Sequence, residues 1–314
     1  MTAAAEARPT SSSGPPIPEH VSIWGELADV DHELRHVTVE VGGVGGVRTR
    51  VLRAGSGPDL VLLHGTGGHL EAYARDVATL ARHFRVTAYD MVGHGWSDLP
   101  DVPYTVDVLS DHLVGLLDAL DIERAHLSGE SLGGWVAAWT AAHHPERVER
   151  LVLNTPGNIA NKLEVMARLR ASTTTAVEDP SDENVRRRVT WLFHDTTQVT
   201  DELVDLRRSV YSRPGFRAAI ANTLVLQDPV TRARFSWDPS WVGRITAPTL
   251  LVWTDHDPTG GLDEAELLRG WLGDVDLHVI TGAGHWPQWE KPGEFVDVHR
   301  RFLGAAPFRA GEHA

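Results

Sequence analysis

One serine motif constrains this chain more than any other feature of its sequence. Ser131 stands between Gly129 and Gly133 in a Gly-x-Ser-x-Gly pattern, after an apolar run and before a helical stretch over 135–143. This order predicts a strand, a sharp turn and a helix that expose the serine hydroxyl and direct the first helical N–H groups at a reacting oxygen. Flanking glycines suit such a turn, because a residue without a Cβ tolerates a strained backbone and the close approach of neighbouring elements. The pattern also occurs in ordinary loops, so its interpretation depends on the rest of the chain.

Strands and helices alternate on both sides of Ser131. Apolar or alternating runs predict strands at 36–41, 47–53, 60–63, 85–89, directly before Ser131, and at 148–154, 248–253 and 276–280, with a glycine-rich hairpin turn at 42–46. Helical patterns cover 70–83, 106–120, 135–143 and 294–303. Strands joined through helices imply right-handed crossovers, so we predict an α/β fold with a mostly parallel, doubly wound sheet.

The alternation stops at Pro156 and Gly157 and resumes near Pro248. From 158 to 243 the pattern is helical with polar breaks, which predicts a helical lid inserted into a core of residues 21–157 and 244–308. The lid block has one more basic than acidic residue, whereas the whole chain has a formal charge of −14. A near-neutral lid on an acidic body suggests an anion site. Alternatively, the lid arginines pair with lid carboxylates, and charge alone does not choose between the two interpretations.

The composition excludes several classes of function. With 29 basic against 43 acidic residues, the chain is a poor partner for nucleic acid or for an anionic membrane surface. The absence of cysteine rules out disulfides and thiolate chemistry and suits a cytoplasmic protein. No apolar run reaches the ~20 residues of a membrane span, and 1–20 lacks the apolar segment of a secretory signal, so we expect a disordered tail there. No nucleotide fingerprint or paired metal-ligand pattern is present, so we expect no cofactor and no metal.

Two polar residues near the end of the chain are candidates to meet Ser131. Asp257 follows the strand at 248–253, and His285 lies on a glycine-flanked loop after the last strand. Catalytic groups of open α/β sheets gather at the carboxyl ends of the strands. A histidine, which titrates at a pH of about 6.5, can take the serine proton, and a carboxylate can hold its ring in the required tautomer. Asp255 is an alternative acid, although it still lies at the strand end, where its side chain can point into the sheet.

The loop 64–68 is richer in glycine than a tight turn requires. It follows the apolar strand at 60–63, so it lies at the same edge of the predicted sheet as Ser131. We predict that the backbone N–H of Thr66 joins that of Leu132 in an oxyanion hole, where both would stabilise the negative charge of a tetrahedral intermediate.

With these residues in place, the chain resembles the α/β hydrolase fold over residues 35–305. More specifically, it is similar to the meta-cleavage product hydrolases, which cut carbon–carbon bonds in ring-fission products of aromatic or steroid catabolism. Two stretches carry this resemblance: the run His-Trp-Pro-Gln-Trp-Glu at 285–290, and the lid segment 195–207, which ends at Arg207. The glycine-rich loop that contains Gly67 matches the wider fold.

The resemblance implies a role for each matched residue. Arg207 would bind the carboxylate of a dienoate substrate, and Trp286 would pack against the substrate beside the base. His285 would first help to ketonise the dienol, after which Ser131 would attack, or assist attack on, the distal carbonyl. The products would be a carboxylic acid and a 2-hydroxypentadienoate.

Gly67 and Glu130 are also expected to contact the substrate. The family usually has asparagine before the nucleophile, where this chain has Glu130. A carboxylate at that position would repel an anionic substrate unless it is paired or protonated.

The sequence therefore predicts a serine-dependent carbon–carbon bond hydrolase whose substrate is a small carboxylate with an apolar part. A carboxylesterase or lactonase with the same triad is the first alternative. A non-catalytic ligand-binding protein of the same fold is the second. A homo-oligomer is compatible with the sequence, which does not decide the oligomeric state.

Overall fold

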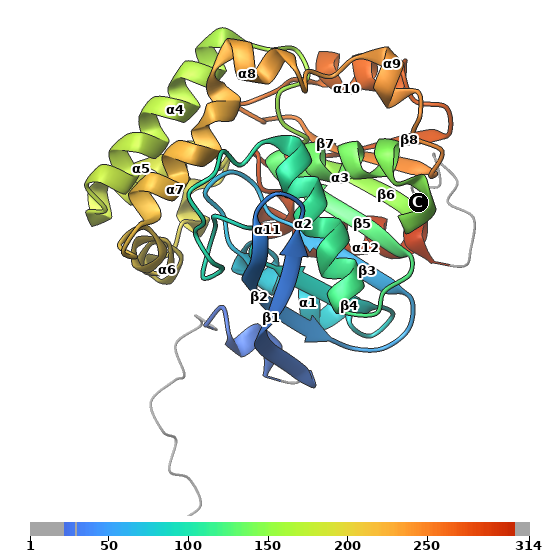
Figure 1. The fold of residues 1–314 in the computed structure, drawn as a ribbon, viewed down its shortest axis with the longest axis horizontal. Helices are drawn as coiled ribbons and strands as arrows, with labels where there is room; N and C mark the ends of the chain where they lie inside the picture. Colours follow the sequence, from blue (N-terminus) through green and yellow to red (C-terminus); the bar gives the residue numbers. More distant parts are fainter. Residues whose placement is uncertain (1–21, 29, 305–314) are drawn as a thin grey trace, which may run out of the picture.

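Eight strands form one sheet in the structure, a computed structural model that describes residues 22–28 and 30–304 (Figure 1). The strands are β1 (His32–Val41), β2 (Gly45–Ala54), β3 (Asp59–Leu63), β4 (Arg85–Tyr89), β5 (Ala125–Glu130), β6 (Val148–Asn154), β7 (Thr249–Thr254) and β8 (Val275–Ile280). Their order in the sheet is β1-β2-β4-β3-β5-β6-β7-β8. The pairs β1–β2 and β2–β4 are antiparallel and the other neighbouring pairs are parallel, which confirms the predicted fold class. The tail expected over 1–20 lies outside the described residues.

Helices connect the parallel strands and cover both faces of the sheet. The α-helices of the core are α1 (Ala74–Leu80), α2 (Val106–Ala119), α3 (Leu132–His143), α10 (Leu262–Arg269), α11 (Pro287–Glu290) and α12 (Pro292–Leu303). Short 3-10 helices are η1 (Gly25–Leu27), η2 (Leu70–Tyr73), η3 (Pro145–Arg147), η4 (Thr196–Gln198) and η5 (Leu224–Gln227). In Figure 1, α2 and α3 lie in front of the strands and α12 lies behind them.

The side chains of β3 show why a fully apolar strand belongs at the centre of this sheet. Leu60 and Leu62 belong to one buried apolar cluster, and Val61 and Leu63 belong to another. Successive side chains of a strand point to opposite faces, so both faces of β3 have to be covered by other elements. The strand therefore brings the loop after Leu63 to the edge of the sheet at a rigidly held position.

Two helices differ from the expectation. The stretch predicted as one helix over 70–83 is divided into η2 and α1. The buried Asp90 side chain accepts a hydrogen bond of 2.7 Å from the backbone N of Leu70, which fixes the start of η2 from another part of the chain. The eight residues of α10 were not predicted, because little more than two turns give too few apolar positions for a helical period to stand out.

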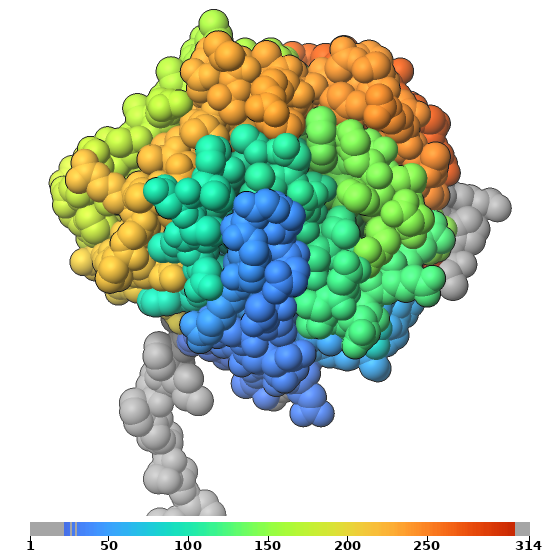
Figure 2. All heavy atoms as spheres, in the orientation of Figure 1, coloured from blue at the N-terminus to red at the C-terminus, as the bar shows by residue number. Residues whose placement is uncertain are grey.

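The remaining helices lie between β6 and β7 in the sequence, in the block 158–243, which we call the lid. They are α4 (Leu163–Glu178), α5 (Asp182–Thr190), α6 (Asp201–Tyr211), α7 (Phe216–Thr223), α8 (Pro229–Ala233) and α9 (Pro239–Val242). Figure 1 shows α4 to α8 grouped at one side of the sheet. On the face shown in Figure 2, the yellow-green and orange lid atoms meet the core without a deep groove. Within the described ranges, no helix is long and apolar enough to cross a membrane.

Candidate active site

Ser131 occupies a strained turn between β5 and α3. Its backbone angles are φ 55° and ψ −117°, a region that residues with side chains rarely adopt. A Cβ at position 129 would lie 2.2 Å from the carbonyl oxygen of Gly133, and a Cβ at 133 would lie 2.3 Å from that of Leu63. Both positions therefore require glycine, and the strand–turn–helix geometry predicted from the spacing is confirmed.

His285 and Asp257 meet beside this turn. The His285 Nδ1 lies 2.9 Å from Oδ2 and 3.0 Å from Oδ1 of Asp257, and the two side chains are only 3% and 1% exposed. The backbone N of Thr259 donates a hydrogen bond of 2.8 Å to Asp257, which holds the carboxylate in place. Asp255 does not point into the sheet as considered above. It is exposed, and its carboxylate accepts a hydrogen bond of 2.8 Å from the backbone N of Gly282.

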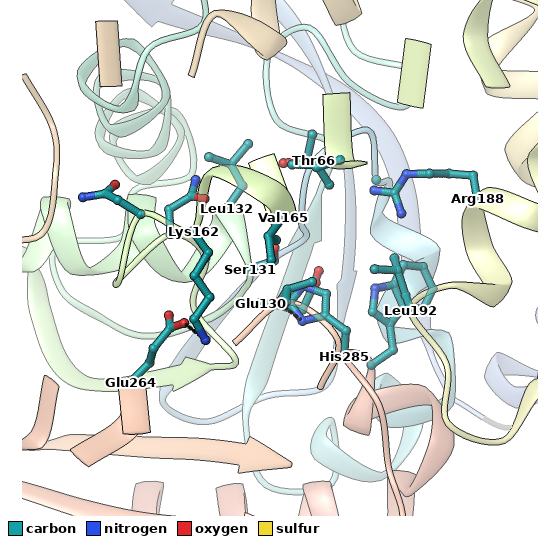
Figure 3. Close-up of a pocket in the computed structure, with 18 of the residues that line it drawn as sticks. Thr66, Glu130, Ser131, Leu132, Lys162, Val165, Arg188, Leu192, Glu264 and His285 are labelled. Atoms are coloured by element: carbon teal, nitrogen blue, oxygen red, sulfur yellow. Dashed lines mark hydrogen bonds and ion pairs between the residues drawn. The ribbon is translucent and has the colours of Figure 1, made fainter. Parts of the chain in front are cut away.

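Glu130 reaches the other nitrogen of the same ring. Its Oε1 lies 3.3 Å from Nε2 of His285, and both side chains are buried. Within the described residues, no hydrogen bond joins Ser131 Oγ to His285 Nε2. Figure 3 shows Ser131, Glu130 and His285 in the same part of one pocket. The Ser131 hydroxyl and the His285 ring thus line the same pocket. The ring nitrogen that would accept the serine proton, Nε2, contacts the Glu130 carboxylate.

The electrostatics of the site couple His285 to its two carboxylates. Burial by itself lowers the pKa of His285, but Asp257 and Glu130 outweigh burial and leave that pKa above its ordinary value. Burial raises the pKa of Glu130 to about 6, although the positive charges of His285 and Arg207 oppose this rise. The protonation of His285 is therefore coupled to the protonation of Glu130.

The two amides predicted for the oxyanion hole both line this pocket. They belong to Thr66, on the loop after β3, and to Leu132, the first residue of α3. Neither amide donates a hydrogen bond to another group in the part of the chain that the structure describes. Gly67, in contrast, does not line the pocket. Its carbonyl oxygen accepts a hydrogen bond of 2.9 Å from Arg207.

The pocket encloses about 690 Å³, a volume that includes space open to solvent. Apolar side chains from both the core and the lid form part of its wall: Leu132, Val165, Leu169, Leu192 and Trp286. At another part of the wall, Nζ of Lys162 pairs with Oε1 of the buried Glu264 at 2.7 Å. Sequence reasoning missed this pair, because the lid and α10 approach each other only through the tertiary fold.

Arg207 and Trp286 both line the pocket. Arg207 is on α6 and only 2% exposed, with its guanidinium carbon 5.3 Å from the centre of the Trp286 ring. Its Nη1 donates to the Gly67 carbonyl and, at 3.3 Å, to the Tyr211 hydroxyl. Its Nε and Nη2 are buried and have no hydrogen-bond partner among the described residues. Half of this guanidinium is therefore available to a ligand.

The lid arginines form two groups: some pair with lid carboxylates at the surface, and others line the pocket. Several pair with lid carboxylates at the surface: Arg186, Arg187, Arg208 and Arg217. Arg188 and Arg207 instead line the pocket, and within residues 22–28 and 30–304 neither forms an ion pair with a carboxylate. Surface pairing is thus found on one set of lid arginines, while two buried lid arginines line the pocket. The described residues contain no cluster of three or more His, Asp or Glu side chains that could hold a metal ion.

Comparison with known proteins agrees with this geometry. The family described as the alpha/beta hydrolase fold matches residues 58–292. The chain is 35% identical over 274 residues to the 2-hydroxymuconate semialdehyde hydrolase of Pseudomonas sp. (strain CF600), an alignment that covers 83% of this chain and 92% of that protein. It is 33% identical over 265 residues to the 2-hydroxy-6-oxo-6-phenylhexa-2,4-dienoate hydrolase of Comamonas testosteroni, with 80% of this chain and 89% of that protein covered.

A solved structure supports the same relationship. The meta-cleavage product hydrolase from Pseudomonas fluorescens IP01, complexed with acetates, superimposes with a TM-score of 0.73 at 30% identity. The match covers 85% of this chain and 96% of that one. The chain therefore belongs to the α/β hydrolase family, as an enzyme similar to the meta-cleavage product hydrolases.

Proposed function

We propose that this enzyme cleaves the carbon–carbon bond of a dienoate ring-fission product, with Ser131 as nucleophile, His285 as base and Asp257 as the group that orients the base. The observation that carries the proposal is the pair of unpartnered Arg207 nitrogens in the pocket that Ser131 and His285 line. Nε and Nη2 form one edge of the guanidinium and match the two oxygens of a carboxylate. The relatives named above, which act on such dienoates, support the same substrate class.

The reaction divides into a proton transfer and an acyl transfer. The substrate first ketonises, as its C2 hydroxyl loses a proton and C5 gains one. Ser131 then attacks the C6 carbonyl and gives its proton to His285, while Thr66 and Leu132 donate to the developing oxyanion. As the C5–C6 bond breaks, its electron pair returns through the conjugated chain to the C2 oxygen and leaves an acyl group on Ser131. Water then hydrolyses the acyl-enzyme to a carboxylic acid.

Before the serine proton can move, His285 has to give up its contact with Glu130. Nε2 lies 3.3 Å from Oε1 of Glu130 in the free enzyme, so the same nitrogen has to turn to Ser131 when substrate binds. The raised pKa of Glu130, about 6, makes this exchange easier, because a carboxyl that is readily protonated holds the ring less strongly.

Loss of the visible absorbance of a yellow dienoate tests the proposal. The wild type should bleach it, and Ser131→Ala should reduce the rate by about 10⁴-fold or more. Rapid cleavage of short-chain nitrophenyl esters without any bleaching would instead favour the esterase or lactonase alternative.

Arg207→Met tests the carboxylate site in the same assay. The loss of the charged donors should lower kcat/KM for the dienoate by roughly a hundredfold, mainly through KM, and leave the cleavage of uncharged esters nearly unchanged. Arg208→Met is the matched control, because Arg208 is the next residue on α6, is half-buried outside the pocket wall and pairs with Asp205. An unchanged kcat/KM in Arg207→Met would contradict the carboxylate site.

A cytoplasmic location and a homo-oligomeric state stay predictions.

A further inference from the structure

Arg188 is a second buried arginine of the pocket, and no role follows for it from the triad. It lies near the end of α5 and is only 4% exposed. Its Nε donates a hydrogen bond of 3.0 Å to Thr173 Oγ1, while its Nη1 has no partner in the described part of the chain. Figure 3 shows the guanidinium directed into the pocket from the wall opposite Lys162. The Arg188 side chain is therefore fixed by Thr173 on one side and faces the pocket on the other.

The neighbours of Arg188 on the same helix make its lack of a partner informative. Arg186 pairs with Asp182 and Asp201, and Arg187 pairs with Glu183, all at the surface. The most buried arginine of the three is thus the one without an acidic partner. Burial lowers its pKa to about 10, so it is still charged at neutral pH. A buried charged donor without a partner is costly, unless a ligand supplies the missing acceptor.

The unpartnered donors of the pocket can be matched to the acceptors of a ligand. Arg207 offers Nε and Nη2, which form one edge of its guanidinium, and Arg188 offers Nη1 and Nη2, since only its Nε forms a hydrogen bond among the described residues. The two arginines are close enough for the charge of Arg207 to lower the pKa of Arg188. A carboxylate occupies two donors on one guanidinium edge. The nitrogens of Arg188 then need an oxygen next to the carboxylate, which a 2-hydroxy or 2-oxo acid supplies and a simple carboxylic acid lacks.

We propose that Arg188 binds the oxygen at C2 of the substrate, beside the carboxylate held by Arg207, and makes the pocket selective for 2-hydroxy and 2-oxo acids. This inference rests on the proposed function, because it uses the same pocket and the same carboxylate site. It also adds a consequence for the reaction. The electron pair released from the C5–C6 bond arrives at the C2 oxygen, so a cation at that oxygen stabilises the departing dienolate.

Two ligands that differ only at C2 test the proposal without any turnover. Binding of 2-oxohexanoate and of hexanoate is measured by calorimetry with Ser131→Ala, which cannot form an acyl-enzyme. The 2-oxo acid should bind about tenfold to a hundredfold more tightly, as expected for one hydrogen bond from a charged donor. Adding Arg188→Met should remove this preference, so that 2-oxohexanoate binds no more tightly than hexanoate. Adding Arg207→Met should weaken both ligands together.

Matched variants separate the proposed contact from general damage. Arg187→Met removes an exposed arginine from the adjacent position and should leave the preference intact. Arg188→Gln keeps a neutral donor of similar length and should lose most of the preference, which covers the case in which Arg188→Met fails to fold. The proposal is overturned if the parent shows no preference, or if a folded Arg188 variant retains it in full.

The role of Arg188 and the proposed reaction are tested by different measurements, so either can be contradicted without the other. If the wild type bleaches the dienoate but the Arg188 variants keep the 2-oxo preference, the inference is wrong and the proposed function stands. If the preference depends on Arg188 but no dienoate is cleaved, the recognition of 2-oxo acids stands and the proposed reaction is wrong.

Discussion

Glu130 adds a second carboxylate beside His285, and no step of the proposed reaction requires its charge. Two carboxylates, those of Asp257 and Glu130, contact the two nitrogens of the His285 ring. An amide in place of Glu130 would offer hydrogen bonds only, whereas a carboxylate also favours the protonated imidazolium. His285 therefore keeps its proton more readily in the free enzyme than the triad alone would cause.

Glu130→Gln should move the acidic limb of the pH profile of kcat/KM to lower pH. Glu130 helps to raise the pKa of His285, so removal of its charge lowers that pKa and makes the neutral base available in more acidic solution. Steady-state kinetics across the acidic range measure the shift. Glu123→Gln, which alters an exposed carboxylate, should leave the profile unchanged. A limb that stays in place or moves to higher pH would contradict the coupling.

The residues of the triad could be proposed from the sequence because each follows a predicted strand. Ser131, Asp257 and His285 lie at strand ends, and parallel strands bring their carboxyl ends to one edge of the sheet. Arg188 could not be singled out in this way. It stands in a run of three arginines, and only the packing of α5 against α4 and α6 decides which of them faces the pocket.

At the scale of elements, the turn between β5 and α3 depends on a close backbone contact. Gly133→Ala should destabilise the protein by about 2–3 kcal/mol, because the new Cβ would lie 2.3 Å from the Leu63 carbonyl oxygen, on backbone that cannot easily move. Urea unfolding measures the loss. Gly293 is a matched control, since it is likewise the second residue of a helix and has open space where the methyl group of an alanine would lie. Equal stability of the two alanine variants would contradict this account.

Strands were easier to predict than helices in this chain. A central strand such as β3 is buried on both faces, so its apolar run is visible in the sequence alone. Helix boundaries depend more on distant partners. The start of η2 reflects the contact between Leu70 and Asp90, which lie 20 residues apart in the sequence.

At the scale of the whole molecule, one buried cation joins three parts of the core. Arg50 of β2 contacts Asp90 after β4 at 2.7 Å and Glu71 of η2 at 2.6 Å, and all three side chains are at least nine-tenths buried. Arg50→Met should destabilise the protein by about 3–5 kcal/mol, because it leaves two buried carboxylates without a cation. Thermal or urea unfolding tests this. Arg48→Met, at an exposed position of the same strand, should have little effect.

The lid leaves the sheet and returns to it at neighbouring strands. β6 and β7 pair in parallel, and Asn154, the last residue of β6, lies opposite Val252. The two ends of the insertion are therefore held by the sheet itself and not by the lid. A chimera could replace the whole lid with that of a related enzyme and keep the junctions in register. The proposed substrate-binding arginines, Arg188 and Arg207, would be exchanged in such a chimera, whereas the proposed triad would stay in place on the core.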